Sequence, residues 1–150
     1  MGYNIQLNRD GSKSTIKKVK FADLPRGGQF ALGDPERLVD ESDLELYVTF
    51  NYAWYYYNTI DSKDGIKCIS GAKAKDIIPL LETALPKLDK MIETERQTGV
   101  VLSQTWGKGS KYDENDDNYW SVSAKNAKIG LEKIIALGNI APYFTFRVYA

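Results

Sequence analysis

The sequence predicts an α+β fold: an antiparallel sheet with two main amphipathic helices packed on one face. Short stretches near both ends of the chain alternate apolar and polar residues, which is typical of strands with one buried face. Two longer stretches between them repeat apolar residues every three or four positions, as amphipathic helices do. Strands that cluster early and late, with helices between them, favour α+β over an alternating α/β arrangement.

Alternation predicts each strand in turn. Residues 3–7 form the first strand, and the residues after it are typical of a turn and end in Asp-Gly. Residues 15–21 are a candidate hairpin partner for it, and residues 29–32 form a short extended piece. Residues 44–50 form the clearest strand, and its register should be well defined because a slip of one residue would expose its whole apolar row. Residues 143–149 form a closing strand.

The two helices differ in how they are delimited. Residues 72–92 carry the first, and Pro79 and Pro86 should bend or split it because each proline removes a backbone donor. The second should begin at Ser123, a favourable N-cap residue, and stop at Gly138, a natural C-terminal residue.

The chain of 150 residues predicts a single domain, 1–150, with one hydrophobic core. Residues 98–118 lie between the two helices and have mostly loop character, so a long inserted loop is predicted there. Loops of that length inside a compact domain tend to be functional or mobile.

Composition excludes several kinds of chemistry. The chain has no histidine, which removes histidine-dependent catalysis and histidine-ligated metal sites. Its one cysteine, Cys68, can form neither an internal disulfide nor a multi-cysteine zinc site, and its apolar neighbours predict a buried structural thiol. The sequence therefore predicts no catalytic residue, no metal site and no cofactor, and the single cysteine favours a reducing, cytoplasmic location.

The charge balance and the hydropathy of the chain limit the kinds of partner that it is expected to bind. Lys and Arg number 20 and so do Asp and Glu, so no overall field draws the chain to nucleic acid or anionic lipid. No apolar run is long enough to span a bilayer, and the first residues lack the pattern of a secretion signal. The sequence therefore predicts no membrane partner, and it carries no strong signal for a nucleic-acid partner.

Two charged stretches have a functional and a simpler interpretation. Residues 106–111 combine glycines and lysines that can cradle an anion, but they lack the phosphate-loop spacing, so a flexible basic loop is favoured. Residues 113–117 are acidic enough to attract Ca²⁺ or Mg²⁺, but they lack the EF-hand spacing, so a solvated acidic loop is favoured.

The stretch Phe50–Asn58 crowds aromatic residues around two asparagines. Its tyrosines Tyr52, Tyr55 and Tyr56 recur at helical steps, which fits packing at a junction between strand and helix. The same rings can form a binding wall, because an aromatic side chain that stacks on a base contributes ~1–3 kcal/mol. They can equally anchor a protein interface. Both interpretations stay open.

Several motifs in order resemble a family of small, uncharacterised proteins of bacteria, prophages and phages. The matching stretches cover most of the chain: Met1–Leu7, Arg26–Gly33, Thr49–Tyr52, Gly65–Lys67, Ile78–Leu81, Asn118–Trp120 and Asn126–Lys128. The chain departs from the family pattern at residues 34–43, at 98–115 and in the ending 141–146, which puts in doubt any function that the family's tail carries.

The resemblance implies a context rather than an activity. Arg26, Asn51, Tyr52 and Trp120 fall inside the matching motifs, and with Tyr55 from the same aromatic stretch they form the predicted ligand-binding set. The function favoured is a small non-catalytic binding protein of phage or mobile-element type in the cytoplasm of a host cell. Such a protein would counteract host defence by sequestering a nucleotide-like ligand or by blocking a defence protein.

Two alternatives remain at this point. One is a small nucleotide-directed enzyme that uses carboxylate, arginine or tyrosine chemistry, and it predicts a pocket that unites Arg26, Asn51 and an acidic residue. The sequence does not decide whether the chain is an enzyme, although it favours one that is not. The other is an oligomeric structural or regulatory phage protein, with a host or phage protein, or a second copy of the chain, as its partner.

Overall fold

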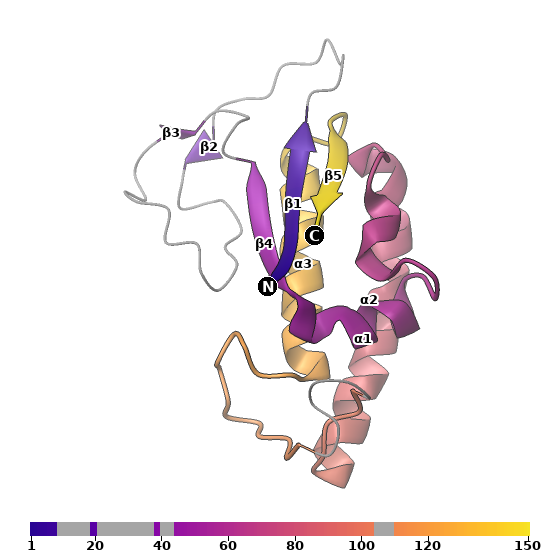
Figure 1. Ribbon diagram of the computed structural model, residues 1–150, viewed down its shortest axis with the longest axis vertical. Coiled ribbons are helices and arrows are strands. Elements are labelled where there is room, and N and C mark those ends of the chain that lie inside the picture. Colours follow the sequence, from indigo (N-terminus) through magenta and orange to yellow (C-terminus); the bar gives the residue numbers. More distant parts are fainter. Residues whose placement is uncertain (9–18, 21–37, 40–43, 104–109) are drawn as a thin grey trace.

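The computed structural model describes residues 1–8, 19–20, 38–39, 44–103 and 110–150. Its main sheet is antiparallel and has the strand order β4-β1-β5 (Figure 1). Central β1 has a partner on each edge, with Ile5 opposite Leu46 on one side and Val148 on the other. The strands are β1 (Gly2–Asn8), β4 (Glu45–Thr49) and β5 (Thr145–Tyr149).

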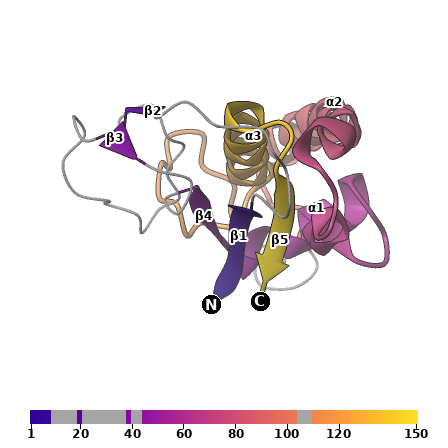
Figure 2. The same ribbon diagram turned by 90° about the horizontal axis from the view of Figure 1, so that it is seen from above.

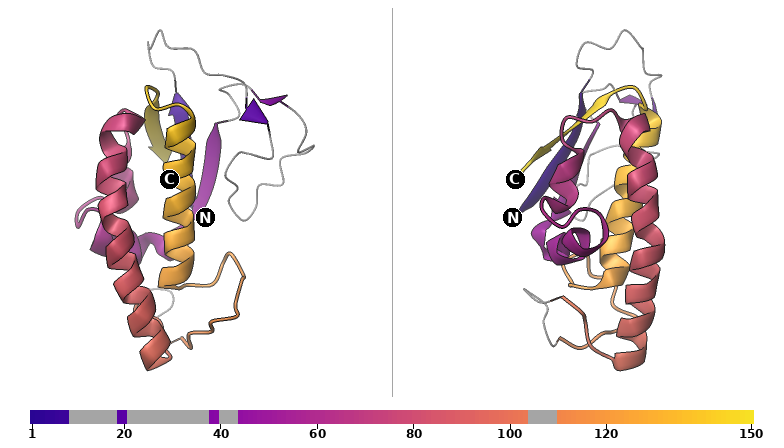
Figure 3. Two further views of the ribbon diagram at one scale, coloured as in Figure 1. Left: turned by 180° about the vertical axis from the view of Figure 1, so that it is seen from behind. Right: turned by 90° about the vertical axis from the view of Figure 1, so that its right-hand side faces the viewer.

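Helices α2 and α3 lie side by side and cover one face of this sheet (Figures 2 and 3). A shorter helix, α1, follows β4 after one turn of 3₁₀ helix. The predicted α+β fold is therefore confirmed, with two main helices on one face. The helices are α1 (Ala53–Thr59), α2 (Ala74–Thr98) and α3 (Ala124–Ile140), and the 3₁₀ turns are Phe50–Tyr52 and Gly65–Ile69.

The core lies between the sheet and the two long helices. The alternation in the strands places every second residue of β1 and β4 on the buried face, and the apolar stripes of α2 and α3 meet them there. Burying these side chains supplies the main driving force for folding. Among the residues that are at most 2 % exposed are Ile5, Leu7, Leu46, Val48, Leu81, Leu88, Leu131, Ile134 and Phe146.

Helix α2 runs through both prolines without a break, which differs from the split that the sequence left open. Pro79 and Pro86 are seven residues apart and both are exposed. They therefore lie on the solvent face of the helix, where water can satisfy the carbonyl groups that lose their partners.

Helix α3 starts as predicted and ends later. The Ser123 hydroxyl accepts a hydrogen bond from the Asn126 N–H at 3.1 Å, as an N-cap should, and the helix continues past Gly138 to Ile140. A Cβ atom at Gly138 would lie 3.0 Å from side-chain atoms of Ile78 and Phe146. This glycine therefore permits close packing against α2 and β5 and does not end the helix.

A small second sheet pairs β2 (Val19–Lys20) with β3 (Leu38–Val39). The described part of the predicted hairpin partner, residues 15–21, therefore pairs with β3 and not with β1. Both edges of β1 are already occupied, and a strand has only two. The rest of that stretch and the extended piece at 29–32 lie outside the described residues.

The free edge of β5 is covered by the chain just before α2. Backbone bonds join Gly71 N to Phe146 O at 2.8 Å and Phe146 N to Ala72 O at 2.9 Å. Nearby, Cys68 is half-buried, and burial raises the pKa of its thiol to about 11, which fits a structural role better than a reactive one. Within the ranges that the structure covers, no helix combines the length and the apolar character needed to cross a membrane.

Candidate functional site

Three of the five predicted site residues meet at one end of the sheet, although they are far apart in sequence. Asn51 and Tyr52 follow β4, and Trp120 belongs to the segment that leads into α3. Tyr55 lies deeper, against α2. Arg26 lies outside the described residues, so its predicted role stays a prediction.

The turn after β4 directs Asn51 and Tyr52 toward that segment. Thr49 ends the strand with extended backbone, and its hydroxyl accepts a hydrogen bond from the Asn51 N–H at 3.2 Å. This cap starts the 3₁₀ turn Phe50–Tyr52, which continues into α1. Because Thr49 acts as an N-cap, the strand stops where the aromatic stretch begins.

The backbone of residues 118–121 is held by side chains from other parts of the chain. All four consecutive carbonyl oxygens of this segment accept a hydrogen bond from a side chain. Most side-chain hydrogen bonds in proteins go to backbone groups or to water, and here four of them converge on one short segment. The bonds run from Asn51 Nδ2 to Trp120 O (2.8 Å), from the Tyr52 hydroxyl to Tyr119 O, and from Asn126 Nδ2 to Asn118 O (2.9 Å) and Ser121 O (2.8 Å).

Tyr119 joins the same segment to the edge of the sheet. Its hydroxyl accepts a hydrogen bond from Thr49 N at 2.7 Å and donates one to Tyr47 O at 3.1 Å. The ring also packs edge-to-face against Tyr52 and Trp120, with centroid distances of 5.7 and 5.0 Å. One tyrosine side chain therefore satisfies outward-facing backbone groups of β4 and supports the neighbouring indole.

Trp120 is 37 % exposed on this fixed backbone. It borders an open, mostly apolar recess of about 330 Å³ that is also lined by Met1, Thr49, Phe50 and Asn51. Phe50 is held in turn by an edge-to-face contact with Tyr3 at 4.7 Å. The recess therefore places an exposed indole beside a ring that the core holds in position, which is the form of a contact surface.

Tyr52 and Tyr55 are buried, with exposed fractions of 2 % and 0 %. Burial is the main cause that raises the pKa of both phenols, so both stay protonated and act as hydrogen-bond donors. Their positions favour the packing interpretation of the aromatic stretch, and a direct ligand contact stays a prediction. Tyr52 also lines a pocket of about 130 Å³ between β4 and α3.

Sequence reasoning missed Glu95, a buried residue that joins several elements. Its carboxyl oxygens accept hydrogen bonds from the Tyr55 hydroxyl at 2.5 Å, from Leu102 N at 2.8 Å and from Ala124 N at 2.9 Å. Ala124 is the first residue of α3, where backbone N–H groups lack partners within the helix. Glu95 therefore ties α2 to α1 and to the start of α3.

The loop between α2 and α3 is tied down by charged groups. Arg96 binds Glu114 through two nitrogens, with Nε–Oε2 at 3.0 Å and Nη2–Oε1 at 2.9 Å. Lys125 Nζ donates to the carbonyl oxygens of Glu114 at 2.9 Å and Asp116 at 3.0 Å. A bidentate pair of this kind fixes geometry as well as charge, so the described part of the loop is well positioned.

These contacts give the loop a defined pH dependence. Hydrogen bonds from Arg96, and then from Tyr112, lower the pKa of Glu114 from 4.5 to about 2. Because the folded pKa is depressed, the stabilisation is fully present above pH 4.5 and should be lost as the pH falls through about 2. NMR titration of the Glu114 carboxyl carbon should show a midpoint near 2, and Arg96→Gln should return it toward 4.5. A midpoint near 4.5 in the unaltered chain would show that the pair does not form in solution.

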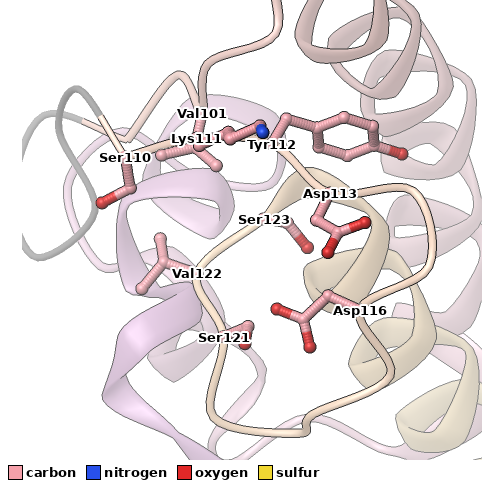
Figure 4. A pocket seen from close by; sticks show the side chains of 9 residues that line it. All are labelled: Val101, Ser110, Lys111, Tyr112, Asp113, Asp116, Ser121, Val122 and Ser123. Carbon is pink, nitrogen blue, oxygen red and sulfur yellow. The ribbon is translucent and has the colours of Figure 1, made fainter.

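A polar pocket of about 270 Å³ lies inside the same loop (Figure 4). The carboxylates of Asp113 and Asp116 and the hydroxyls of Ser121 and Ser123 point into it. The acidic stretch 113–117, for which the sequence favoured a solvated loop, thus contributes one wall of a pocket. Among the residues that the structure describes, no cluster of three acidic, cysteine or histidine side chains offers a metal site.

Comparison of the chain with known protein families, with curated proteins and with solved structures finds no match in any of the three.

Proposed function

We propose that this chain is a non-catalytic binding protein that docks a partner protein on Trp120 and the recess beside it. The observation that carries the proposal is the set of side-chain bonds that holds residues 118–121 while the indole stays 37 % exposed. Tryptophan is enriched among the residues that dominate interface energies. An anchor that is ordered before binding loses less conformational entropy when the complex forms.

The recess suits a protein side chain better than a nucleotide. Its described lining is mostly apolar and includes no guanidinium or lysine ammonium group that would form the usual pairs with a phosphate, although the α-amino group of Met1 belongs to a lining residue. One N–H of the Asn51 amide donates to Trp120 O, which leaves fewer of its hydrogen-bonding groups to read a base edge. Of the two binding modes that the sequence left open, partner blocking is therefore the better supported.

The enzyme alternative finds less support in this geometry. It requires a pocket that unites Arg26, Asn51 and an acidic residue. The described lining of the recess contains Asn51 but no acid. The phenols of Tyr52 and Tyr55 have raised pKa values and occupied hydroxyls, so neither is prepared to act as a general base.

The phage-type context remains the one that the family resemblance implies, and it points to a host defence protein or a phage protein as the partner. A photo-reactive amino acid in place of Trp120, in cells of a phage-infected host, should give one discrete cross-linked product. The same residue in place of Tyr143, which is 51 % exposed at a distant site, is the matched control and should not give that product.

The cross-linked partner, once purified, should bind Trp120→Ala at least about tenfold more weakly than the unaltered chain, while Tyr143→Ala should bind normally. Equal binding by both variants would contradict docking on Trp120. A product that contains two copies of this chain would favour the oligomeric alternative instead.

A further inference from the structure

The pocket of about 130 Å³ between β4 and α3 is separate from the Trp120 recess, and the two share no described lining residue. Its described lining is mostly apolar and includes Tyr52, Tyr119 and Gly130. Ile129, another lining residue, is 45 % exposed, so a ligand can reach the pocket from solvent. An engineered apolar cavity of ~150 Å³ in another protein admits benzene. The volume here therefore suits one small ring.

Tyr52 and Tyr119 present rings to this pocket, because both of their hydroxyl hydrogens are already used. The Tyr52 hydroxyl donates to Tyr119 O, and the Tyr119 hydroxyl donates to Tyr47 O at 3.1 Å. The two rings meet edge-to-face with a centroid distance of 5.7 Å. Walls of this kind favour a further aromatic ring, which can add to the same edge-to-face packing.

Asn126 also lines the pocket, and it combines burial with an unused acceptor. The residue is 6 % exposed, and its Nδ2 hydrogens are donated to Asn118 O at 2.9 Å and Ser121 O at 2.8 Å. No described group donates a hydrogen bond to its Oδ1 atom. Within the described part of the chain, Asn4 Oδ1 is the one fully enclosed side-chain oxygen or nitrogen that lacks a partner, so Asn126 Oδ1 faces accessible space.

This acceptor points to a donor that a bound molecule supplies. Buried polar groups normally have a hydrogen-bond partner, and a buried water molecule normally makes about three bonds. The mostly apolar lining offers water few other partners. A molecule that carries one donor on an apolar body matches the pocket better than water does.

The charges of the described lining balance, which favours a neutral ligand. Asp117 contributes one carboxylate and Lys133 contributes one ammonium group. A lining without net charge attracts neither a phosphate nor a cation over long range.

We propose that this pocket binds a small neutral aromatic compound that carries one hydroxyl group, which is a phenol. Its ring would lie against Tyr52 and Tyr119, and its hydroxyl would donate to Asn126 Oδ1. A phenol stays uncharged at neutral pH because its pKa is about 10.

NMR titration of the full, isotope-labelled chain with phenol tests the site. Phenol should shift the backbone amide signals of Ile129, Gly130 and Lys133 in a saturable way. Anisole, the methyl ether of phenol, has the same ring and no donor, so it is the matched comparison compound and should bind at least about tenfold more weakly. Benzoate and benzylamine, which carry a charge, should also bind more weakly than phenol.

Variants localise the binding. Ile129→Ala removes part of the apolar wall and should weaken phenol at least about fivefold. Leu80→Ala is the matched control, because Leu80 is 40 % exposed and lies on α2 outside this pocket, and it should leave binding within about twofold of the unaltered chain. Trp120→Ala should also leave phenol binding unchanged, so this proposal and the docking proposal fail independently.

Asn126→Ala removes the acceptor and should abolish the preference for phenol over anisole, in a variant that circular dichroism shows to be folded. The comparison of the two compounds on the unaltered chain needs no variant, so it decides even where Asn126→Ala does not fold.

Three results would overturn the proposal. The first is that phenol does not bind saturably, or that it shifts only signals away from α3. The second is that anisole, benzoate or benzylamine binds as tightly as phenol. The third is that Ile129→Ala binds phenol as well as Leu80→Ala does.

Discussion

Replacing Glu95 with alanine is expected to lower the free energy of unfolding by about 3–5 kcal/mol. The substitution removes the acceptor of three hydrogen bonds whose donors come from α1, from residue 102 and from the start of α3. Each buried donor left without a partner costs about 1–3 kcal/mol, and water that enters the cavity recovers part of this cost. The loss should therefore exceed that of an ordinary surface substitution by several-fold.

Urea denaturation of three further variants separates what the individual hydrogen bonds of Glu95 contribute to the free energy of unfolding. Glu95→Gln keeps the shape and one strong acceptor, so it should cost less than Glu95→Ala. Tyr55→Phe removes only one of the three donors and should cost about 1–2 kcal/mol. Glu132→Ala, at an exposed position on α3, removes a carboxylate that binds none of these elements and serves as the neutral control. A Glu95→Ala variant within about 1 kcal/mol of the unaltered chain would show that Glu95 does not hold these elements together.

Gly130→Ala should destabilise the protein by up to about 2 kcal/mol even though alanine is the better helix former. A Cβ atom at this position would lie 2.6 Å from the Tyr56 hydroxyl oxygen, and Tyr56 is fully buried. Its hydroxyl also donates to Ala127 O at 2.9 Å, and a shift of the ring away from residue 130 would weaken that bond. Overpacking of this kind costs about 1–3 kcal/mol, against about 1 kcal/mol gained in helix propensity.

A double-mutant cycle identifies the cause of that loss. Tyr56→Phe alone should cost about 1 kcal/mol, because it removes the bond to Ala127 O. In the Gly130→Ala background the same change removes the atom that clashes, so the double variant should be at least as stable as Gly130→Ala alone. Free energies that simply add would mean that the close contact with Tyr56 is not the source of the effect.

The elements that depend on local pattern were predictable from sequence. The alternation in residues 3–7 and 44–50 corresponds to β1 and β4, and Ser123 caps α3 as expected. The predicted first helix ended at residue 92, whereas α2 continues to Thr98, because the charged residues after Ile92 hide the pattern. Glu95 lies seven positions after Leu88 on the buried stripe, and that spacing was the signal that could have identified it.

The candidate site was only partly predictable, for a physical reason. The motifs selected Asn51, Tyr52 and Trp120, and the structure brings these three together. Their roles depend on bonds between side chains and backbone carbonyls about seventy residues away, as from Asn51 to Trp120 at a separation of 69. Such bonds produce no repeating pattern of apolar and polar residues by which a sequence could predict them. The pocket around Asp113 and Asp116 was hidden for the same reason, since Arg96 and Lys125 shape the loop from two helices.

The junction after β4 holds Trp120 in place. This role can be tested by fluorescence anisotropy decay in a chain whose only tryptophan is Trp120, made with Trp54→Phe and Trp106→Phe. The indole should then move only with the whole molecule, and Asn51→Ala should add a fast local motion because it removes the bond to Trp120 O.

Asn58→Ala is the matched control, since its amide binds a different carbonyl, Trp54 O at 2.7 Å, and it should leave the decay unchanged. If the fast motion is already present in the single-tryptophan chain, or if Asn51→Ala does not add it, the claim that this junction holds Trp120 is wrong.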